Sequence, residues 1–241
     1  MKNKTLYYIS TPTFIAAEIA ILMCILFAPH SEYSCYAAIV VVLVYSLLFA
    51  SDKPKVMLMQ LALVCTLAAD TFLVGLTTQV QWLAMTAFFV CQSLYFARLL
   101  LELKTKKWLV DNIAIRLILI AAAITAAFVV LKDKFDYVSA ISVVYYASLI
   151  HNLVIACCMI KKSPMFAIGL IFFLLCDTVV GLNSAIGTYI SISETSFIYQ
   201  ISHTSFNLAW TFYVPSQTLI ALSIVDATKD KNSENRTEKT K

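Results

Sequence analysis

The sequence predicts an all-α membrane protein, a bundle of eight transmembrane helices. Of its 241 residues, 61% are hydrophobic and only 13% are charged, whereas soluble globular domains are roughly half apolar and about a quarter charged. The mean hydropathy is correspondingly high, at +0.82. The apolar residues form runs of about 20, the length that crosses a bilayer core as a helix. Eight such runs use nearly the whole chain, so any site must be built from the helices themselves.

Charged residues and turn residues delimit the eight runs. The connections at 52–54, 77–79 and 161–163 are short. Neighbouring helices are therefore expected to form antiparallel hairpins. In chain order, the expected spans cover residues 7–27, 33–50, 55–76, 80–101, 113–131, 138–160, 164–185 and 203–225.

The first run begins like a secretory signal, because Lys2 and Lys4 precede its apolar residues. Glu18 interrupts the run, however, and Pro29 follows the small residue at its end, which is a poor context for cleavage. We therefore expect residues 7–27 to be retained as the first span.

The seven cysteines are scattered, almost all within the apolar runs, and show no paired pattern in the outward connections. They are best interpreted as small core residues. No grouping of His, Cys and acidic residues has the spacing of a metal site. Neither a metal nor another cofactor is expected, and His151 is interpreted as a hydrogen-bonding residue between helices.

The basic residues predict the orientation, since Lys and Arg collect on the cytoplasmic side of inserted helices. If both termini are cytoplasmic, eight spans place every Lys and Arg on that side except Lys132 and Lys134. An odd number of spans would destroy this bias. The net charge of +4 then reflects topology, and no nucleic-acid partner is expected. The polar segment 226–241 is expected to be a disordered cytoplasmic tail of a protein in the cell (plasma or inner) membrane.

The connection 186–202 is the longest and lies on the outer side in this topology. It contains several Ser and Thr residues, one Gly and one Glu. Connections of this length are either functional or merely mobile. It is interpreted either as a flexible cover over an outward opening or as an interfacial loop.

Two aspartates lie inside apolar runs in near copies of one phrase, ADTFLVGL at 69–76 and CDTVVGL at 176–182. A carboxylate inside the bilayer costs roughly 2.5–3.5 kcal/mol on insertion scales, so such residues usually face a polar cavity and act there. The phrases lie four spans apart, in spans of the same direction, as a parallel 4+4 repeat would place them. Asp70 and Asp177 each follow a cytoplasmic lysine by 15 residues, which puts both carboxyls about 22 Å up their helices.

If both helix faces point inward, the two acids meet across the bundle. One then keeps its proton beside an ionised partner, which supplies an acid and a base. Gly169 and Gly181 share the helix face of Asp177, and small residues there permit close helix contact. Gln92 and His151 lie about 20 Å below the outer surface, so the polar residues form a column. A column suits a long amphiphile lying along the bundle, and it equally suits a transport path.

Four short motifs carry a resemblance to a known family. They are Asp70 late in span three, Gln92-x-x-Tyr95 in span four, Cys176-Asp177 in span seven, and Tyr213 to Gln217 in span eight. In these motifs the chain resembles the YhhN-type transmembrane lysoplasmalogenase family, whose members are eight-span bundles. Gln92 stands where the family usually has His, and Cys176 where it usually has Ser. Glutamine forms hydrogen bonds but cannot relay a proton at neutral pH.

The resemblance implies hydrolysis of the vinyl ether bond of a lysoplasmalogen, a membrane lipid, to a fatty aldehyde and a glycerophospho-headgroup. Asp70 and Asp177 would form the catalytic acid and base. The substrate headgroup or the attacking water would be oriented by Gln92, Tyr95, Tyr213 and Gln217.

Two other classes of function remain open. A proton-coupled secondary transporter of a small or lipid-like substrate would use paired acids and two halves rocking about a central site. The spans show few Gly or Pro breaks apart from Pro215, however. The second of these classes is a non-catalytic scaffold or sensor, in which the two matched acids would have no evident role. The oligomeric state is not predicted.

Overall fold

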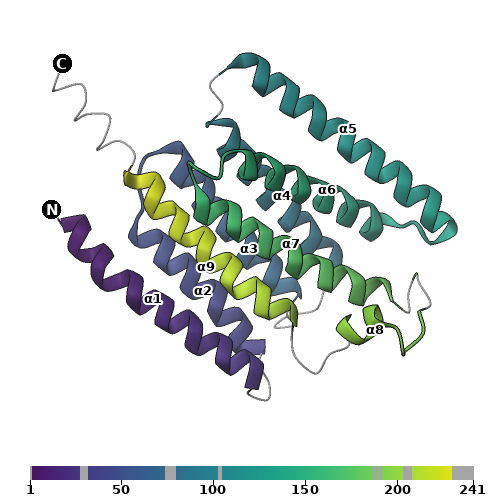
Figure 1. Cartoon of the computed structure of the whole chain (residues 1–241), viewed down its shortest axis with the longest axis horizontal. Coiled ribbons are helices and arrows are strands. Elements are labelled where there is room, and N and C mark those ends of the chain that lie inside the picture. The colour runs from purple at the N-terminus through teal and green to yellow at the C-terminus, as the bar shows by residue number, and fades with distance from the viewer. Residues whose placement is uncertain are drawn as a thin grey trace.

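The structure is a computed structural model that describes residues 2–27, 32–73, 80–102, 105–186, 189, 192–202 and 208–229 (Figure 1). Nearly all of these residues are helical. The elements are α1 (Lys2–Phe27), α2 (Glu32–Leu48), α3 (Pro54–Leu73), α4 (Gln81–Leu100), α5 (Lys106–Leu131), the 3₁₀ turn η1 (Lys132–Lys134), α6 (Tyr137–Cys158), α7 (Pro164–Ala185), α8 (Phe197–Ser202) and α9 (Leu208–Lys229).

Seven helices of the described chain are long and apolar enough to cross a membrane, namely α1, α3, α4, α5, α6, α7 and α9. The chain is therefore an all-helical integral membrane protein. The helix α2 is also apolar but has only 17 residues. At 1.5 Å per residue that is about 25 Å, slightly less than a bilayer core of about 30 Å.

Several elements differ from the sequence expectation. The helix α1 begins at Lys2 and not at residue 7, and α9 continues to Lys229, so the first residues of the expected disordered tail 226–241 are helical. The fifth long helix begins at Lys106 instead of residue 113, because the Thr105 side chain accepts a hydrogen bond from the Trp108 backbone N–H (3.4 Å) and caps the helix. Arg116 therefore lies almost three turns from the start of the helix and not in its first turn. The short helix α8 occupies part of the connection 186–202, for which no helix was expected. Residues 74–76 and 203–207 of the expected spans, and 230–241 of the expected tail, lie outside the described residues.

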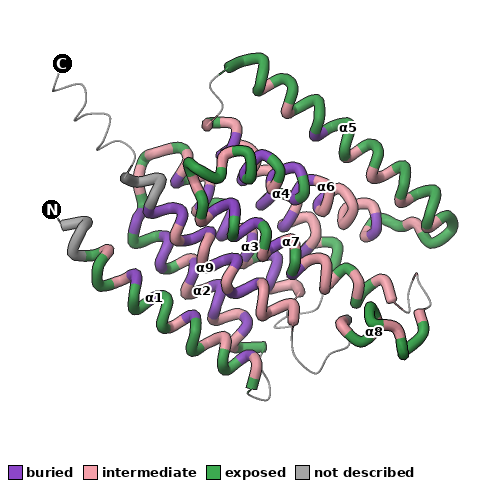
Figure 2. The backbone as a smooth tube through the Cα atoms, viewed as in Figure 1, coloured by how far each residue is buried: buried purple, intermediate pink, exposed green. Residues whose placement is uncertain are grey.

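The helix packing follows one pattern twice. In the first half of the chain α1 packs on α2 and α3 packs on α4. In the second half α5 packs on α6 and α7 packs on α9 in the same way. Likewise α2 contacts both α3 and α9, while α6 contacts both α7 and α4. The helices α3, α4, α7 and α9 thus form the centre, and α1 and α5 lie at opposite edges (Figure 1). Figure 2 shows α5 exposed along most of its length, and Arg116 is its one buried residue.

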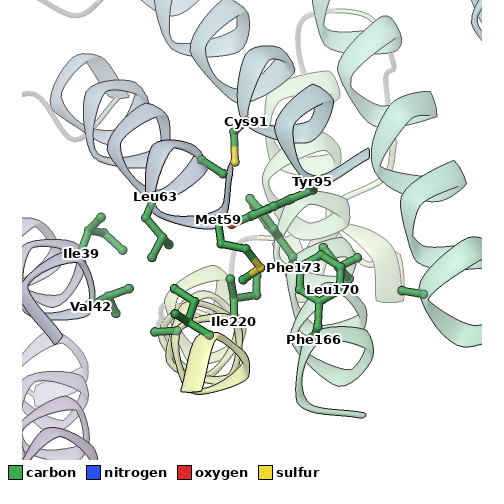
Figure 3. Close-up of a cluster of buried hydrophobic side chains, with 14 of the residues drawn as sticks. Ile39, Val42, Met59, Leu63, Cys91, Tyr95, Phe166, Leu170, Phe173 and Ile220 are labelled. Atoms are coloured by element: carbon green, nitrogen blue, oxygen red, sulfur yellow. The ribbon is translucent and has the colours of Figure 1, made fainter. Parts of the chain in front are cut away.

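The central helices interlock through large side chains, seen in Figure 3 around Met59, Tyr95, Phe173 and Ile220. Hydrocarbon lipid tails are as apolar as these side chains, so helices in a membrane associate through close packing and polar contacts rather than through the hydrophobic effect. Close packing here depends on the shape of each helix surface.

The helices α7 and α9 approach each other closely at Gly169. A Cβ on this residue would lie 2.8 Å from Ile220 Cγ1 and 3.1 Å from the Ser216 carbonyl oxygen. The Ser216 hydroxyl donates to the Gly169 carbonyl at 2.8 Å. Gly181 differs, since a Cβ there would meet no described atom within 4 Å. Of the two glycines expected to permit close helix contact, only Gly169 sits at such a contact.

Polar side chains mark both ends of the bundle. At one end, Lys55 Nζ lies 2.6 Å from Glu102 Oε1, which links the start of α3 to the end of α4. Lys162, between α6 and α7, donates to the Glu102 carbonyl at 3.4 Å. The start of α1 and the end of α9 lie at this same end (Figure 1).

At the opposite end, Asp136 caps α6. Its Oδ1 accepts hydrogen bonds from the Ser139 hydroxyl (2.6 Å) and the Ser139 backbone N–H (2.8 Å). These bonds hold the pKa of the Asp136 carboxyl below its ordinary value of 3.8. The Ser139 hydroxyl also lies 3.0 Å from the Tyr189 hydroxyl, which ties the cap to the residues that follow α7.

Candidate functional site

Asp70 lies one turn before the end of α3 with only 2% of its surface exposed. The Tyr213 hydroxyl, from α9, donates to Asp70 Oδ2 at 2.7 Å. Hydrogen bonds to a charged acceptor are the stronger ones in proteins. A neighbouring helix therefore fixes the rotation of the Asp70 carboxyl.

Asp177 occupies the corresponding part of α7 and is half-buried. Its Oδ2 accepts a hydrogen bond from the Tyr145 hydroxyl of α6. Each aspartate is thus held through one oxygen by a tyrosine from a different helix. Among the described residues, the other carboxyl oxygen of each aspartate has no such tethering tyrosine, so it is the one able to face a substrate or a water molecule.

The two aspartate–tyrosine pairs belong to one site. The carboxyls of Asp70 and Asp177 are close enough to repel each other electrostatically, and the hydroxyls of Tyr145 and Tyr213 also interact. The Cys176 thiol interacts with both carboxyls. The matched phrases therefore contribute to one polar cluster, although they lie four helices apart in the chain.

Aromatic rings join the two pairs. The Phe88 ring lies 5.6 Å from the Tyr145 ring and 6.1 Å from the Phe173 ring, centre to centre. The Phe173 ring in turn lies 5.7 Å from the Tyr213 ring. The site thus combines two acids and two phenols with apolar aromatic walls. Such a site can both donate and accept a proton beside an apolar surface.

The other residues expected at the site lie farther along the bundle. Gln92 is fully buried and hydrogen-bonded to Asn152. The Tyr95 ring packs edge-on against Phe166 at 5.4 Å, and its hydroxyl lies near the Cys91 thiol. Gln217 is fully buried, and its amide atoms have no hydrogen-bond partner among the described residues. Within the described chain, the hydrogen bonds found for these residues do not reach either aspartate.

Gln92 belongs to a second polar layer, between α4, α5 and α6. Arg116 Nη1 donates to Asn152 Oδ1 at 3.0 Å. Asn152 Nδ2 donates to the Gln92 carbonyl oxygen at 2.7 Å and to Gln92 Oε1 at 2.9 Å. Tyr145 and Asn152 are seven residues apart on one helix, so the two polar layers are separated by about 10 Å.

Sequence reasoning placed neither Tyr145 nor Arg116 at a site. Tyr145, Ser148 and Asn152 recur at helical spacing on one face of α6, and all three are buried. That stripe is a signal that could have identified Tyr145. Arg116 lies within the apolar run of the expected span 113–131, and an ionisable residue inside a span is itself a signal. It was missed because it was counted with the cytoplasmic basic residues near the start of that span.

A comparison with known sequences agrees with this picture of a helical membrane protein. The sequence profile of the YhhN family matches residues 11–224. No curated protein and no solved structure matches the chain. The matched region contains both aspartate phrases and every residue of the candidate site. The chain therefore belongs to the YhhN family.

Proposed function

We propose that this protein is an intramembrane lipid hydrolase that cleaves the vinyl ether bond of a lysoplasmalogen, with Asp70 and Asp177 as the acid and base. The observation that carries the proposal is that two intramembrane carboxyls, from α3 and α7, interact electrostatically and that each accepts a hydrogen bond from a tyrosine of another helix. Intramembrane acids usually mark a functional path. Two acids together supply both partners of a proton transfer.

The reaction needs only those two groups and water. The protonated carboxyl gives its proton to the alkene carbon remote from the ether oxygen, and an oxocarbenium ion forms. The ionised carboxyl stabilises this cation and then accepts a proton from the water that attacks it. The resulting hemiacetal breaks its carbon–oxygen bond to release a fatty aldehyde and the glycerophospho-headgroup. The accepted proton restores one protonated carboxyl in the pair.

The surroundings of the acids suit this substrate. Phe88 and Phe173 give the site apolar walls between the two tyrosines. An alkenyl chain can lie there at no cost in desolvation, because it leaves one apolar medium for another. Tyr145 and Tyr213 act as positioning residues that fix the carboxyls, while Gln92, Tyr95 and Gln217 contact more distant parts of the lipid.

We further propose eight membrane crossings with both termini in the cytoplasm of a cell whose plasma or inner membrane holds the protein. The start of α1 and the end of α9 lie at one end of the bundle (Figure 1), which supports an even number of crossings. The helix α2 then crosses as well, supported by α1, α3 and α9. The twofold recurrence of helix pairs supports two four-helix halves that each contribute one aspartate.

The decisive experiment measures aldehyde release from a lysoplasmalogen by the purified protein. Asp70→Asn and Asp177→Asn should each reduce turnover by at least about a hundredfold, because removal of a general acid or base typically costs 10²–10⁴ in rate. Asp111→Asn, at an exposed position of α5, is the matched control and should keep full activity.

Full activity of either site variant would overturn the assigned pair. An inactive wild-type protein that instead accumulates the intact lipid in sealed vesicles under a proton gradient would establish transport and refute hydrolysis.

A further inference from the structure

Arg116 is a buried cation in a helix that otherwise faces outward. Only 7% of its surface is exposed, and it is the one buried residue of α5. Its guanidinium carbon lies 4.4 Å from the centre of the Phe96 ring, and its Nη1 donates to the neutral Asn152. A salt bridge joins Lys55 and Glu102 at the end of the bundle. A buried charge is expensive unless it is paired, and no described carboxylate pairs with Arg116.

The hydrogen bonds of this layer fix the orientation of both amides. A guanidinium only donates, so the Asn152 atom facing Arg116 must be its carbonyl oxygen. Asn152 Nδ2 must then donate, and the Gln92 atom that receives it must be Oε1. The Gln92 amide nitrogen is therefore left over as a donor.

The donors that remain have no partner. Gln92 Nε2 and Arg116 Nη2 are both buried without a hydrogen-bond partner among the described residues. His151 Nδ1 is unpartnered as well, and its ring lies 5.4 Å from the Phe96 ring on which Arg116 stacks. Unsatisfied buried donors cost about 1–3 kcal/mol each, and more when charged. An anion bound here would neutralise the positive charge and accept hydrogen bonds from the unpaired N–H groups beside it.

We propose that Arg116 and Gln92 form an anion site that binds the phosphate group of a lysophospholipid. The identification of the ligand rests on the proposed function, which places the vinyl ether at the aspartate pair. The phosphate of such a lipid stands one glycerol unit away from that bond. The two polar layers lie about 10 Å apart along α6, a separation that one glycerophosphate can bridge.

This assignment also gives Gln92 a role in place of the histidine that the family resemblance led us to expect. A neutral imidazole accepts through one nitrogen and donates through the other. Gln92 does the same with its amide, accepting from Asn152 and presenting Nε2. The layer thus needs a hydrogen-bonding side chain at this position and not a proton relay.

The test is binding of lipids that cannot be hydrolysed, measured by isothermal titration calorimetry in nanodiscs. The probes are a saturated-ether lysophospholipid, the alkylglycerol of the same chain length, which lacks the phosphate, and inorganic phosphate. The wild-type protein should bind the phospholipid at least about tenfold more tightly than the alkylglycerol, as expected for hydrogen bonds to a charged group. Arg116→Gln should abolish that preference.

Arg98→Gln is the matched control, because Arg98 is also a buried arginine, lies 3.9 Å from the Phe166 ring and donates to Ser163 at 2.9 Å. Its preference for the phospholipid should match that of the wild type. If Arg116→Gln does not fold, Gln92→Met is used instead, since it keeps the side-chain size and removes the unpaired amide. It should lower the preference severalfold.

Each outcome is decisive for the anion site. Tight phospholipid binding without competition by inorganic phosphate supports a lipid-borne phosphate. Binding of inorganic phosphate that is lost in Arg116→Gln supports the same site with a soluble phosphate as its ligand. Equal affinity for the two lipids in the wild type, or a preference that survives in the folded variant, overturns the proposal. The binding measurement involves no turnover, so it tests the anion site even if the protein does not hydrolyse lysoplasmalogen.

Discussion

The contact between α7 and α9 at Gly169 yields a stability prediction that does not depend on any catalytic assignment. Gly169→Ala adds one Cβ, which would lie 2.8 Å from Ile220 Cγ1 and within 3.3 Å of backbone atoms of Ser216 and Ile220. Two of these three neighbours are backbone atoms, so a rotamer change alone cannot relieve the overlap. The helix α9 must shift by a few tenths of an ångström, and the Ser216 hydrogen bond to the Gly169 carbonyl must stretch with it.

The expected loss of stability follows from two opposing effects. Overpacking a filled contact costs about 1–3 kcal/mol, whereas replacing glycine by alanine inside a helix gains up to about 1 kcal/mol. Gly181→Ala lies in the same helix but has open space around its Cβ. It gains helix propensity without overpacking a contact. The difference between the two variants therefore isolates the contact, and we expect Gly169→Ala to be about 1–3 kcal/mol less stable than Gly181→Ala.

Reversible unfolding in mixed detergent micelles, followed by loss of helical circular dichroism, measures this difference. The wild type provides the common reference for both variants. Equal stability of Gly169→Ala and Gly181→Ala would refute the close approach of α7 and α9 at this residue.

Two further predictions concern hydrogen bonds of named carboxyls. Asp136→Ala should lower the free energy of unfolding by about 1 kcal/mol at neutral pH, as loss of a helix cap does. The pKa of Asp136 is lower in the folded protein than in the unfolded one. The stabilisation by its carboxylate is therefore present above about pH 4 and is lost as the pH falls further. A wild-type advantage that persisted at pH 2 in unfolding experiments would contradict this. Tyr213→Phe and Tyr145→Phe should each lower aldehyde release. The loss should be about ten- to a hundredfold for the tyrosine that donates to the ionised carboxyl, since that bond is worth about 1.5–3 kcal/mol, and smaller for the one that donates to the protonated carboxyl. Tyr146→Phe, whose hydroxyl meets Thr178 instead of an acid, should retain activity, and equal losses in all three would count against the assignment.

Several features of this protein could be predicted from local properties of the chain. Hydropathy marks helices that must satisfy their own backbone hydrogen bonds inside a membrane, so the helical membrane class follows from composition and run length. The cost of burying a carboxylate is likewise local, and together with the repeated phrase it singles out Asp70 and Asp177 within the apolar runs. The profile match then placed the chain in the YhhN family.

The lengths of the apolar runs did not predict the helix boundaries correctly in every case. Seven described helices meet the length of a span, and α2 falls short because only 17 of its residues are helical. The fifth helix begins seven residues earlier than hydropathy indicated, since Lys106 and Lys107 are charged yet form helix as readily as apolar residues do. Hydropathy indicates which residues favour lipid, whereas helix propensity is a separate property that a polar residue can also have.

The sequence by itself determined that this protein is a helical membrane protein with two acids at matched positions, because each of those facts depends on residues and their immediate neighbours. Only the tertiary structure decided that Tyr213 holds Asp70, that Tyr145 holds Asp177, and that Arg116 turns inward from an exposed helix. The physical reason is that the rotation of each helix and the choice of its neighbours are set by packing between distant segments, such as the glycine contact of α7 with α9.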